Sequence, residues 1–431
     1  MYRKLISELV GWKNKKNRMP LVLYGARQVG KTHILLEFAK QCYENTAYFN
    51  FENNPSLSSY FDQTIDEKKI IGYLETEINQ QIIPGKTLII FDEIQVCERA
   101  LTSLKYFNEN APQYHIACAG SLLGVAINRE KYSFPVGNVD SMIMYPLDFE
   151  EYLLALDGEK LRDEIKNCFG QKTAMPTPLH EKAGDIYKKY LITGGMPWVI
   201  NEYLREESFI AASEAQRKIL SDYAADSAKY ANPTECVKIR AAYDSIPIQL
   251  AKENKKFQYK LVQRGGTSSI FGIAIDWLEC AGIVNKCTKI ETALFPLSAY
   301  RDLSNFKLYV SDTGLLTLKS GMSPTSILNN ETINIPFVGA IAENYVAQCL
   351  TAKKYPLYYW TSNATAETDF VIQKEDKIIP VEVKAGENVK SRSLSVFVEK
   401  YKPEYSIRVS MKNFGFENNI LSVPLYGVWC L

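Results

Sequence analysis

Short apolar runs separated by longer amphipathic stretches fill residues 1–155. The run Thr87-Leu-Ile-Ile-Phe is apolar at nearly every position and ends in two carboxylates. Such a continuous run is typical of a strand buried on both faces of a parallel sheet. Four more segments have the length and composition of strands: 20–24, 47–52, 115–119 and 141–146. Because helical stretches lie between them, the pattern predicts a doubly wound, three-layer α/β domain.

A glycine-rich segment follows the first predicted strand. It reads Gly25-Ala26-Arg27-Gln28-Val29-Gly30-Lys31-Thr32 and precedes a helical stretch at 33–40, which is the G-x-x-x-x-G-K-[ST] pattern in its strand–loop–helix context. Backbone N–H groups and the positive helix end suit a phosphate chain. We expect Lys31 to reach the β- and γ-phosphates of ATP, and Thr32 to ligate Mg²⁺. The alternative is a glycine-rich turn that only resembles a phosphate loop.

Polar residues end two of the other predicted strands. Asp92 and Glu93 follow the run at 87–91, and Ser121 follows the strand at 115–119. The carboxyl ends of parallel strands form the ligand edge of such a sheet. We expect Asp92 to hold Mg²⁺, Glu93 to polarise the attacking water, and Ser121 to contact the γ-phosphate or the water. Each could instead cap a following helix, a role that these residue types favour.

These motifs together resemble the AAA+-type P-loop ATPases, because the phosphate loop, Phe91-Asp92-Glu93 and Ala119-Gly120-Ser121 occur in that family's order. Tyr145-Pro-Leu-Asp-Phe-Glu-Glu-Tyr and Gly194-Gly-Met-Pro197 are similar to one prokaryotic subgroup, and the resemblance covers nearly the whole chain. The subgroup carries a C-terminal domain of unassigned function with a restriction-nuclease-like fold. Some members have Gly-Arg before the fifth strand, where this chain has Gly137-Asn138. The resemblance therefore assigns no arginine finger; Arg27 and Arg129 are nearby arginines without an assigned role.

The middle of the chain is helical by pattern as far as residue 230. We expect residues 156–230 to form a helical lid over the nucleotide; the alternative is plain helical packing. From Lys238 to Arg264 there are seven basic and two acidic residues. A capped helix at 267–282 and a possible hairpin formed by 283–290 and 306–310 then suggest a winged helix, a module that places a helix in the DNA major groove. Lys260, Arg264 and Ser268 are the candidate DNA contacts, unless the module serves packing or protein contact.

The last third carries a second candidate site. Asp369, Glu382 and Lys384 form a D-x(12)-E-x-K pattern, and Glu382 and Lys384 share one face of a predicted strand at 378–384. Glu343 lies on a predicted helix at 339–350. The arrangement resembles the PD-(D/E)XK nuclease fold, in which two carboxylates bind a divalent metal and the lysine orients or deprotonates water. The alternative is a structural Glu–Lys pair in a nuclease-like domain that binds without cutting.

Composition adds limits to this picture. Hydrophobic residues make up 46% and charged residues 23%, which excludes a disordered, collagenous or coiled-coil chain. The formal net charge of +1 argues against a protein that coats nucleic acid. Nine cysteines without a CxxC pair and only three histidines suggest reduced thiols and leave little for a zinc site. We expect no signal peptide and no membrane span, and a cytoplasmic location.

The predicted fold class is α/β, with four parts. They are a P-loop ATPase core at 1–155, the helical lid at 156–230, a winged-helix-like segment at 231–315 and the nuclease-like domain at 316–431.

The predicted function is Mg²⁺-dependent ATP hydrolysis that couples nucleotide state to contact with double-stranded DNA. The alternatives are a nucleotide-gated module with slow turnover that binds a protein partner, and an ATP-coupled, metal-dependent nuclease. The oligomeric state stays open.

Overall fold

The computed structural model describes residues 1–120, 135, 137–329, 335–362, 366–386 and 392–431. Its residues divide into two compact units. The N-terminal unit is Tyr2–Tyr145 with the short stretch Cys280–Gly282, and the C-terminal unit comprises Pro146–Glu279 and Ile283–Leu431. Each helix among the described residues is too short or too polar to cross a lipid bilayer.

A parallel sheet forms the centre of the N-terminal unit. Its strands are β1 (Leu21–Tyr24), β2 (Asn45–Asn50), β3 (Thr87–Asp92), β4 (His115–Ala119) and β5 (Asp140–Ile143), in the order β2-β3-β4-β1-β5. All of their pairings are parallel. The prediction of a doubly wound α/β domain is confirmed, with strand limits that differ by a few residues.

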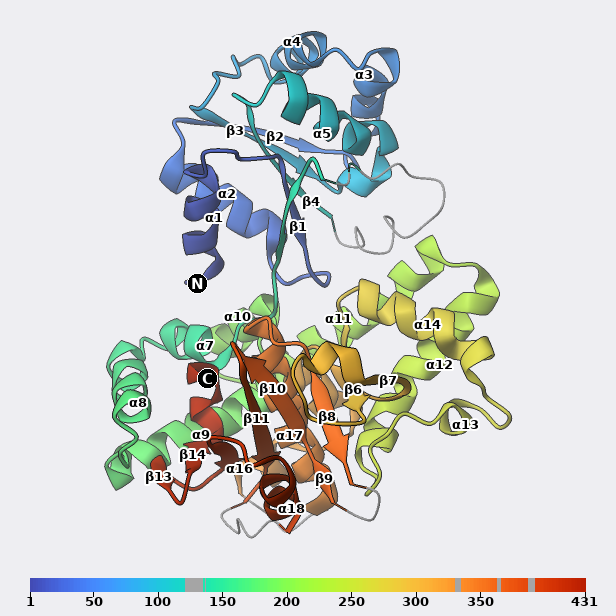
Figure 1. The fold of residues 1–431 in the computed structure, drawn as a ribbon. Coiled ribbons are helices and arrows are strands. Elements are labelled where there is room, and N and C mark those ends of the chain that lie inside the picture. The colour runs from blue at the N-terminus through green and yellow to red at the C-terminus, as the bar shows by residue number, and fades with distance from the viewer. Residues whose placement is uncertain (121–134, 136, 330–334, 363–365, 387–391) are drawn as a thin grey trace. The chain divides into compact units, whose positions relative to one another are not determined.

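Helices cover both faces of this sheet, so the unit has three layers (Figure 1). On one face lie α1 (Leu5–Lys13) and α2 (Lys31–Cys42), and on the other α3 (Ser58–Gln63), α4 (Glu67–Ile78) and α5 (Glu98–Asn110). Every residue of β3 is buried, as its continuous apolar run predicts. Phe49, Phe61 and Phe91 belong to the core between the sheet and α3–α5. This core fixes the strand ends that carry the polar residues.

The C-terminal unit begins with five helices. They are α7 (Phe149–Ala155), α8 (Glu159–Gln171), α9 (Thr177–Thr193), α10 (Pro197–Glu206) and α11 (Phe209–Tyr230). The acidic start of α7 has a local cause, because Asp148 and Glu151 form a reciprocal capping box. Three helices follow: α12 (Pro233–Leu250), α13 (Tyr259–Val262) and α14 (Ser268–Cys280). The strands β6 (Val284–Ile290) and β7 (Arg301–Val310) then pair as an antiparallel hairpin.

Two sheets occupy the remainder of this unit. One has the order β7-β6-β8-β9, with β8 at Tyr358–Thr361 and β9 at Glu367–Thr368. The other has the order β10-β11-β12-β14-β13. Its strands are β10 (Phe370–Lys374), β11 (Lys377–Val383), β12 (Ser406–Ser410), β13 (Gly415–Glu417) and β14 (Ile420–Pro424). The helices of this region are α15 (Thr313–Lys319), α16 (Pro324–Leu328), α17 (Ile335–Ala352) and α18 (Arg392–Tyr401).

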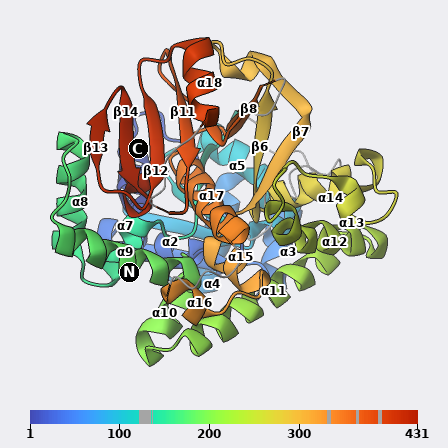
Figure 2. The ribbon, with the colours of Figure 1, turned by 90° about the horizontal axis from the view of Figure 1, so that it is seen from below.

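The long helix α17 contacts strands of both sheets, β7 and β11 (Figure 2). The sequence predicts one strand over 367–372, but the structure breaks it at Asp369. Residues before Asp369 pair with β8 and residues after it pair with β11. Asp369 therefore lies where the chain passes from one sheet to the other.

The Gly194-Gly195 turn and the start of α15, which are far apart in the sequence, meet around the buried carboxylate of Asp312. Asp312 accepts hydrogen bonds from the backbone N–H of Gly195 at 2.6 Å, across 117 residues, and from that of Leu315 at 3.0 Å. Gly194 has φ +71°, and a Cβ there would lie 2.1 Å from the Asp312 carboxylate. Thus Asp312 both caps α15 and fixes the turn between α9 and α10.

The helical segment has further contacts with the end of the chain. The backbone N–H of Met175 and its carbonyl oxygen bond to the side chain of Asn413, at 2.9 and 2.8 Å. His180 hydrogen-bonds to Tyr426. Buried Gln348 of α17 donates to Tyr190 of α9 at 2.9 Å. Helices from the middle of the sequence and segments near its end therefore share one packed unit.

The buried Asp312 gives a pH prediction. Burial raises the pKa of its carboxyl group to about 6, against the lowering effect of the backbone hydrogen bonds. The unfolded value is about 3.9, so the folded state holds the proton more tightly, and the stabilisation falls as pH rises from about 4 to about 6, by at most about 3 kcal/mol. Asp312→Asn cannot ionise. Thermal unfolding should therefore show wild type losing stability relative to the variant between pH 4.5 and pH 7.5, and a pH-independent difference would contradict this.

Candidate functional site

The loop between β1 and α2 has the backbone that a phosphate loop needs. Gly25, Gln28 and Gly30 all have positive φ values, +140°, +66° and +98°. At Gly25 the lack of a side chain is required, because a Cβ would lie 2.2 Å from the backbone oxygen of Met144. The predicted loop residues 25–32 thus connect a buried strand to the first turn of α2, as the motif requires.

Lys31 and Thr32 occupy that first turn. The buried ammonium group of Lys31 donates to the carbonyl oxygens of Gly25 and Ala26, at 2.8 and 2.9 Å. It is therefore held over the loop, at the positive end of a helix. The Thr32 hydroxyl donates to Oδ2 of Asp92 at 2.9 Å, so the structure brings these two sequence-predicted residues together.

The carboxylate of Asp92 is the centre of a small polar cluster. Asp92 is buried at the end of β3, and its Oδ2 also accepts from the Tyr48 hydroxyl at 2.8 Å and from Nδ2 of Asn50 at 3.4 Å. The sequence reasoning missed Tyr48 and Asn50. Both lie on β2, where Asn50 is the direct partner of Asp92 in the register between β2 and β3. Only the strand order could have revealed them.

The neighbouring Glu93 has φ +51°, an uncommon backbone conformation for a residue with a side chain. Its Oε2 accepts from Nε2 of Gln95 at 2.5 Å. Gln95 is a further residue that the sequence reasoning missed, because its contact depends on the sharp turn after β3.

Ser121 and Arg129 lie outside the described residues, so the arrangement around β4 is described only as far as Gly120.

Thr32 and Asp92 fit a magnesium ion that accompanies a nucleotide. Hydroxyl and carboxylate oxygens are the ligands that Mg²⁺ prefers, and Mg²⁺ usually takes only one or two protein carboxylates with the phosphates. The two side chains touch at the phosphate-loop end of β3, so their donor set and position agree with that role.

Tyr48 gives a testable prediction at this cluster. Burial raises its pKa to about 12, so the hydroxyl stays protonated and donates to Asp92. Tyr48→Phe removes the hydrogen bond, and we expect the apparent Mg²⁺ affinity in ATP turnover to fall about 10-fold. The control is Tyr60→Phe, because the Tyr60 hydroxyl donates to the exposed carboxylate of Glu77. Equal Mg²⁺ titration curves for all three proteins would contradict the positioning role of Tyr48.

The basic segment and α14 expose two different kinds of surface. Lys260 on α13, Arg264 in the following turn and Ser268 at the start of α14 are all exposed, as a DNA contact requires. The body of α14 exposes aliphatic and acidic side chains instead: Ile270, Ile273, Asp276 and Glu279. The basic charge is therefore concentrated before α14, and the exposed face of the helix itself is not basic.

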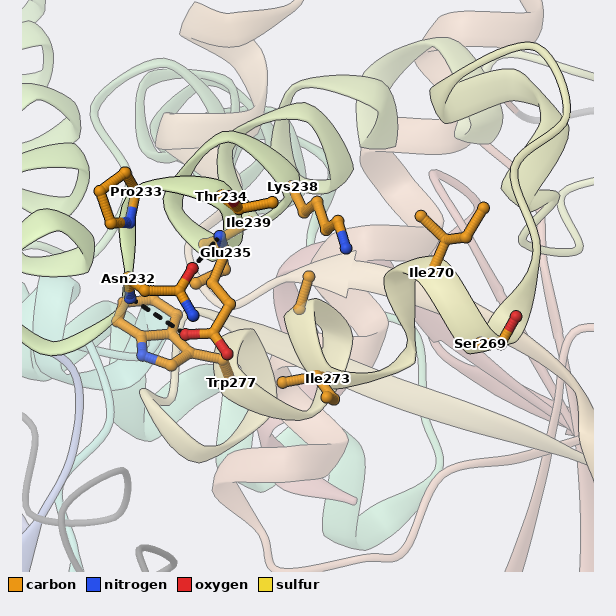
Figure 3. Close-up of a pocket in the computed structure, with 11 residues that line it drawn as sticks. Asn232, Pro233, Thr234, Glu235, Lys238, Ile239, Ser269, Ile270, Ile273 and Trp277 are labelled. Carbon is orange, nitrogen blue, oxygen red and sulfur yellow. Dashed lines mark hydrogen bonds between the residues drawn. The ribbon is translucent and has the colours of Figure 1, made fainter.

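A hollow of about 400 Å³ lies between the N-terminal parts of α12 and α14 (Figure 3). Ile239, Ile270 and Ile273 line it, and Ile273 is 68% exposed. Asn232 and Glu235 form a capping box at its edge. The Trp277 ring also lines the hollow, and its buried indole N–H has no hydrogen-bond acceptor among the described residues. Such an apolar hollow with an exposed rim suits a protein side chain better than a phosphate.

The residues of the predicted nuclease-like site do come together in the C-terminal unit. Glu343 of α17 is fully buried. Glu382 of β11 and Lys384, the residue after the end of β11, form an ion pair at 2.7 Å. An oxygen of Asp369 accepts from the backbone N–H of Val383 at 2.8 Å. The sequence reasoning missed two lysines that enter the same cluster, Lys255 and Lys307. Both form ion pairs with Glu343.

The charges of this cluster shift one another's ionisation. Burial works against the ionised form of Glu343, but the ammonium groups of Lys255 and Lys307 outweigh it and lower its pKa to about 2. Burial, with the charges of Glu343 and Glu382, raises the pKa of Asp369 to about 8. The cluster therefore keeps the carboxylate of Glu343 ionised, and it favours the protonated form of Asp369.

This cluster does not fit the divalent metal that a nuclease-like site implies. A metal site needs several carboxylate, imidazole or thiol groups directed at one point. Nowhere in the described part of the chain do three such side chains come together in a way that could hold a metal ion. Lysine ammonium groups contact the carboxylates of Glu343 and Glu382 instead.

Three family models match parts of the chain. Residues 17–153 match a family described as an AAA domain. Residues 184–326 match a domain of unknown function, DUF8612, and residues 338–426 match a second one, DUF4143. No protein with a curated function matches the chain.

Among solved structures, three that match this chain are the following. The Walker-type ATPase paby2304 of Pyrococcus abyssi has a TM-score of 0.44 and 15% identity, covering 74% of this chain and 95% of its own. The ORC2 protein of Aeropyrum pernix has a TM-score of 0.38 and 12% identity, covering 82% and 95%. AMPPCP-bound DnaA from Aquifex aeolicus has a TM-score of 0.30 and 13% identity, covering 65% and 89%.

Proposed function

We propose that this chain, whose N-terminal unit has the fold and the family match of an AAA-type P-loop ATPase domain, hydrolyses ATP with Mg²⁺ and couples its nucleotide state to contact with double-stranded DNA. ATP binding follows from that fold. Hydrolysis, the magnesium requirement and the DNA contact are the further steps of the proposal.

One observation carries the enzymatic part. The hydroxyl of Thr32, from the phosphate loop, touches the carboxylate of Asp92, from the end of β3. These are the two residues that hold Mg²⁺ in P-loop ATPases. In this proposal Lys31 binds the β- and γ-phosphates, and the magnesium ion neutralises charge that develops on them. Glu93, held by Gln95, orients the attacking water.

The exposed basic segment supports the coupling to DNA. Exposed Lys260, Arg264 and Ser268 follow one another in the sequence, on α13, in the turn after it and at the start of α14, and the β6–β7 hairpin comes next. In this proposal residues 231–315 act as the winged-helix-like part that contacts DNA phosphates, and residues 156–230 act as the helical lid. The mixed α/β region at 316–431 is the nuclease-like domain of the same proposal.

The test of DNA coupling is an ATPase assay with and without double-stranded DNA, beside a gel-shift titration at several salt concentrations. We expect DNA to stimulate turnover, and we expect salt to weaken binding. Lys260→Ala and Arg264→Ala should each weaken binding to all DNA sequences alike. Each should also reduce the slope of the logarithm of the binding constant against the logarithm of the salt concentration by about 1. The matched control is Lys68→Ala, an exposed lysine of the N-terminal unit. DNA binding that both variants leave unchanged would contradict the assigned surface.

A second candidate function is a nucleotide-gated module that binds a protein. The hollow in Figure 3, its exposed Ile273 and the acidic residues on α14 favour it. The gel-shift titration separates the two functions. No DNA complex even at low salt, combined with ATP binding and slow turnover, supports the protein-binding module and contradicts the DNA contact.

A further inference from the structure

Two lysines from outside the predicted nuclease-like segment enter its acidic cluster. Lys307 lies on β7 and is 0% exposed, and Lys255 lies between α12 and α13. Both precede residue 316 in the sequence, so no pattern within 316–431 includes them. Their positions follow from the packing of β7 and the segment after α12 against α17.

Each ammonium group has a defined set of partners. Lys307 bonds to Glu343 Oε1 at 3.0 Å and to Glu367 Oε1 at 2.6 Å. Lys255 bonds to Glu343 Oε2, so both oxygens of that carboxylate contact a lysine. The hydroxyl of buried Tyr309 also donates to Glu343 Oε1. The ammonium group of Lys384 forms an ion pair with Oε1 of Glu382 at 2.7 Å.

The balance of charge in this cluster is already nearly neutral. Four carboxyl groups, those of Glu343, Glu367, Asp369 and Glu382, face three ammonium groups, those of Lys255, Lys307 and Lys384, and the raised pKa of Asp369 favours its neutral form. A divalent cation could approach Glu343 only by displacing a buried ammonium group. That group would then lose its counter-charge in a region with little water, which is strongly unfavourable.

We propose that the acidic cluster of the nuclease-like region is held by the chain's own lysines in place of a divalent metal ion. Its role is to join the segment after α12 and strand β7 to α17 and β9. The carboxylates that would bind a catalytic metal in a nuclease are thus the anionic members of an internal ion-pair network. The region then contributes binding or structural support and does not cut a phosphodiester bond.

The first test measures metal binding directly. Mn²⁺ is added to the full chain without nucleotide, and bound Mn²⁺ is counted by electron paramagnetic resonance for wild type, Glu382→Gln and Asp369→Asn. Circular dichroism confirms that each variant is folded. We expect the number of bound Mn²⁺ ions per chain to be the same in all three proteins. One equivalent that binds to wild type and is lost in both variants would overturn the proposal.

The second test measures the ion-pair network. Lys255→Met keeps an unbranched, apolar side chain but leaves Glu343 with one ammonium partner fewer, and we expect the melting temperature to fall by about 5–10 °C. Lys256→Met is the matched control, one residue further along the same segment, and should change the melting temperature by about 1 °C or less. The double variant Lys255→Met with Glu343→Gln should lose less stability than the sum of the losses in the two single variants. Unchanged stability of Lys255→Met, or strict additivity, would overturn the network.

Discussion

We expect Lys31→Ala to reduce ATP turnover by at least about 100-fold, which corresponds to about 2.7 kcal/mol of lost transition-state stabilisation. The ammonium group of Lys31 lies over the phosphate loop, held by the carbonyl oxygens of Gly25 and Ala26. In the proposed reaction, alanine leaves the loop without the positive charge that would contact the transferred phosphoryl group. The measurement is steady-state phosphate release with Mg²⁺ and saturating ATP.

The control for this change lies on the same helix. Lys40 is exposed in the last turn of α2, so Lys40→Ala removes the same charge at the other end. It should leave turnover within about twofold of wild type, because surface substitutions away from a site have small effects. Turnover that is indistinguishable between wild type and Lys31→Ala would refute ATP hydrolysis at this loop.

The second large effect is on stability. Gly194→Ala should destabilise the C-terminal unit by about 4 kcal/mol or more, because two costs combine. The φ of +71° is unfavourable for alanine, and the added Cβ would lie 2.1 Å from the Asp312 carboxylate. That carboxylate also holds the N–H of Gly195, so moving it away breaks a buried hydrogen bond. Chemical denaturation followed by fluorescence measures the change.

Gly265→Ala is the control that separates the two costs. Gly265 has φ +77°, but a Cβ there would meet no atom within 4 Å. It should therefore cost only the backbone strain, about 1 kcal/mol. If Gly194→Ala costs no more than Gly265→Ala, the contact with Asp312 is not limiting and the explanation given for the turn is wrong.

The N-terminal fold was predictable because its signals are local. The run ending at Asp92 is buried throughout, and Gly25, Lys31 and Thr32 lie in one short segment between a strand and a helix. These features depend on neighbours in the sequence. Tyr48 and Asn50 approach Asp92 only because β2 lies beside β3, and strand order is not contained in any single segment.

The C-terminal site was predictable only in part, for the same reason. Spacing placed Glu382 and Lys384 on one face of a strand, and the structure pairs them. Lys255 and Lys307 come from distant segments and change the chemistry of the cluster, so the metal role of Asp369 and Glu382 could not be judged from spacing alone. The break at Asp369 was also missed, because a strand that changes sheets keeps the same composition.

The hydrogen bonds that join Gly195 to Asp312 and Met175 to Asn413 limit how the chain can be divided. A fragment that stops near residue 230 lacks both Asp312 and Asn413, and a fragment that stops near residue 315 lacks Asn413, so each would expose polar groups and buried surface that these residues cover. Such fragments should aggregate or be degraded, whereas a cut near residue 146 separates the two compact units. For the same reason, exchange of the C-terminal region between related proteins should succeed only when the helices from residue 146 onward move with it.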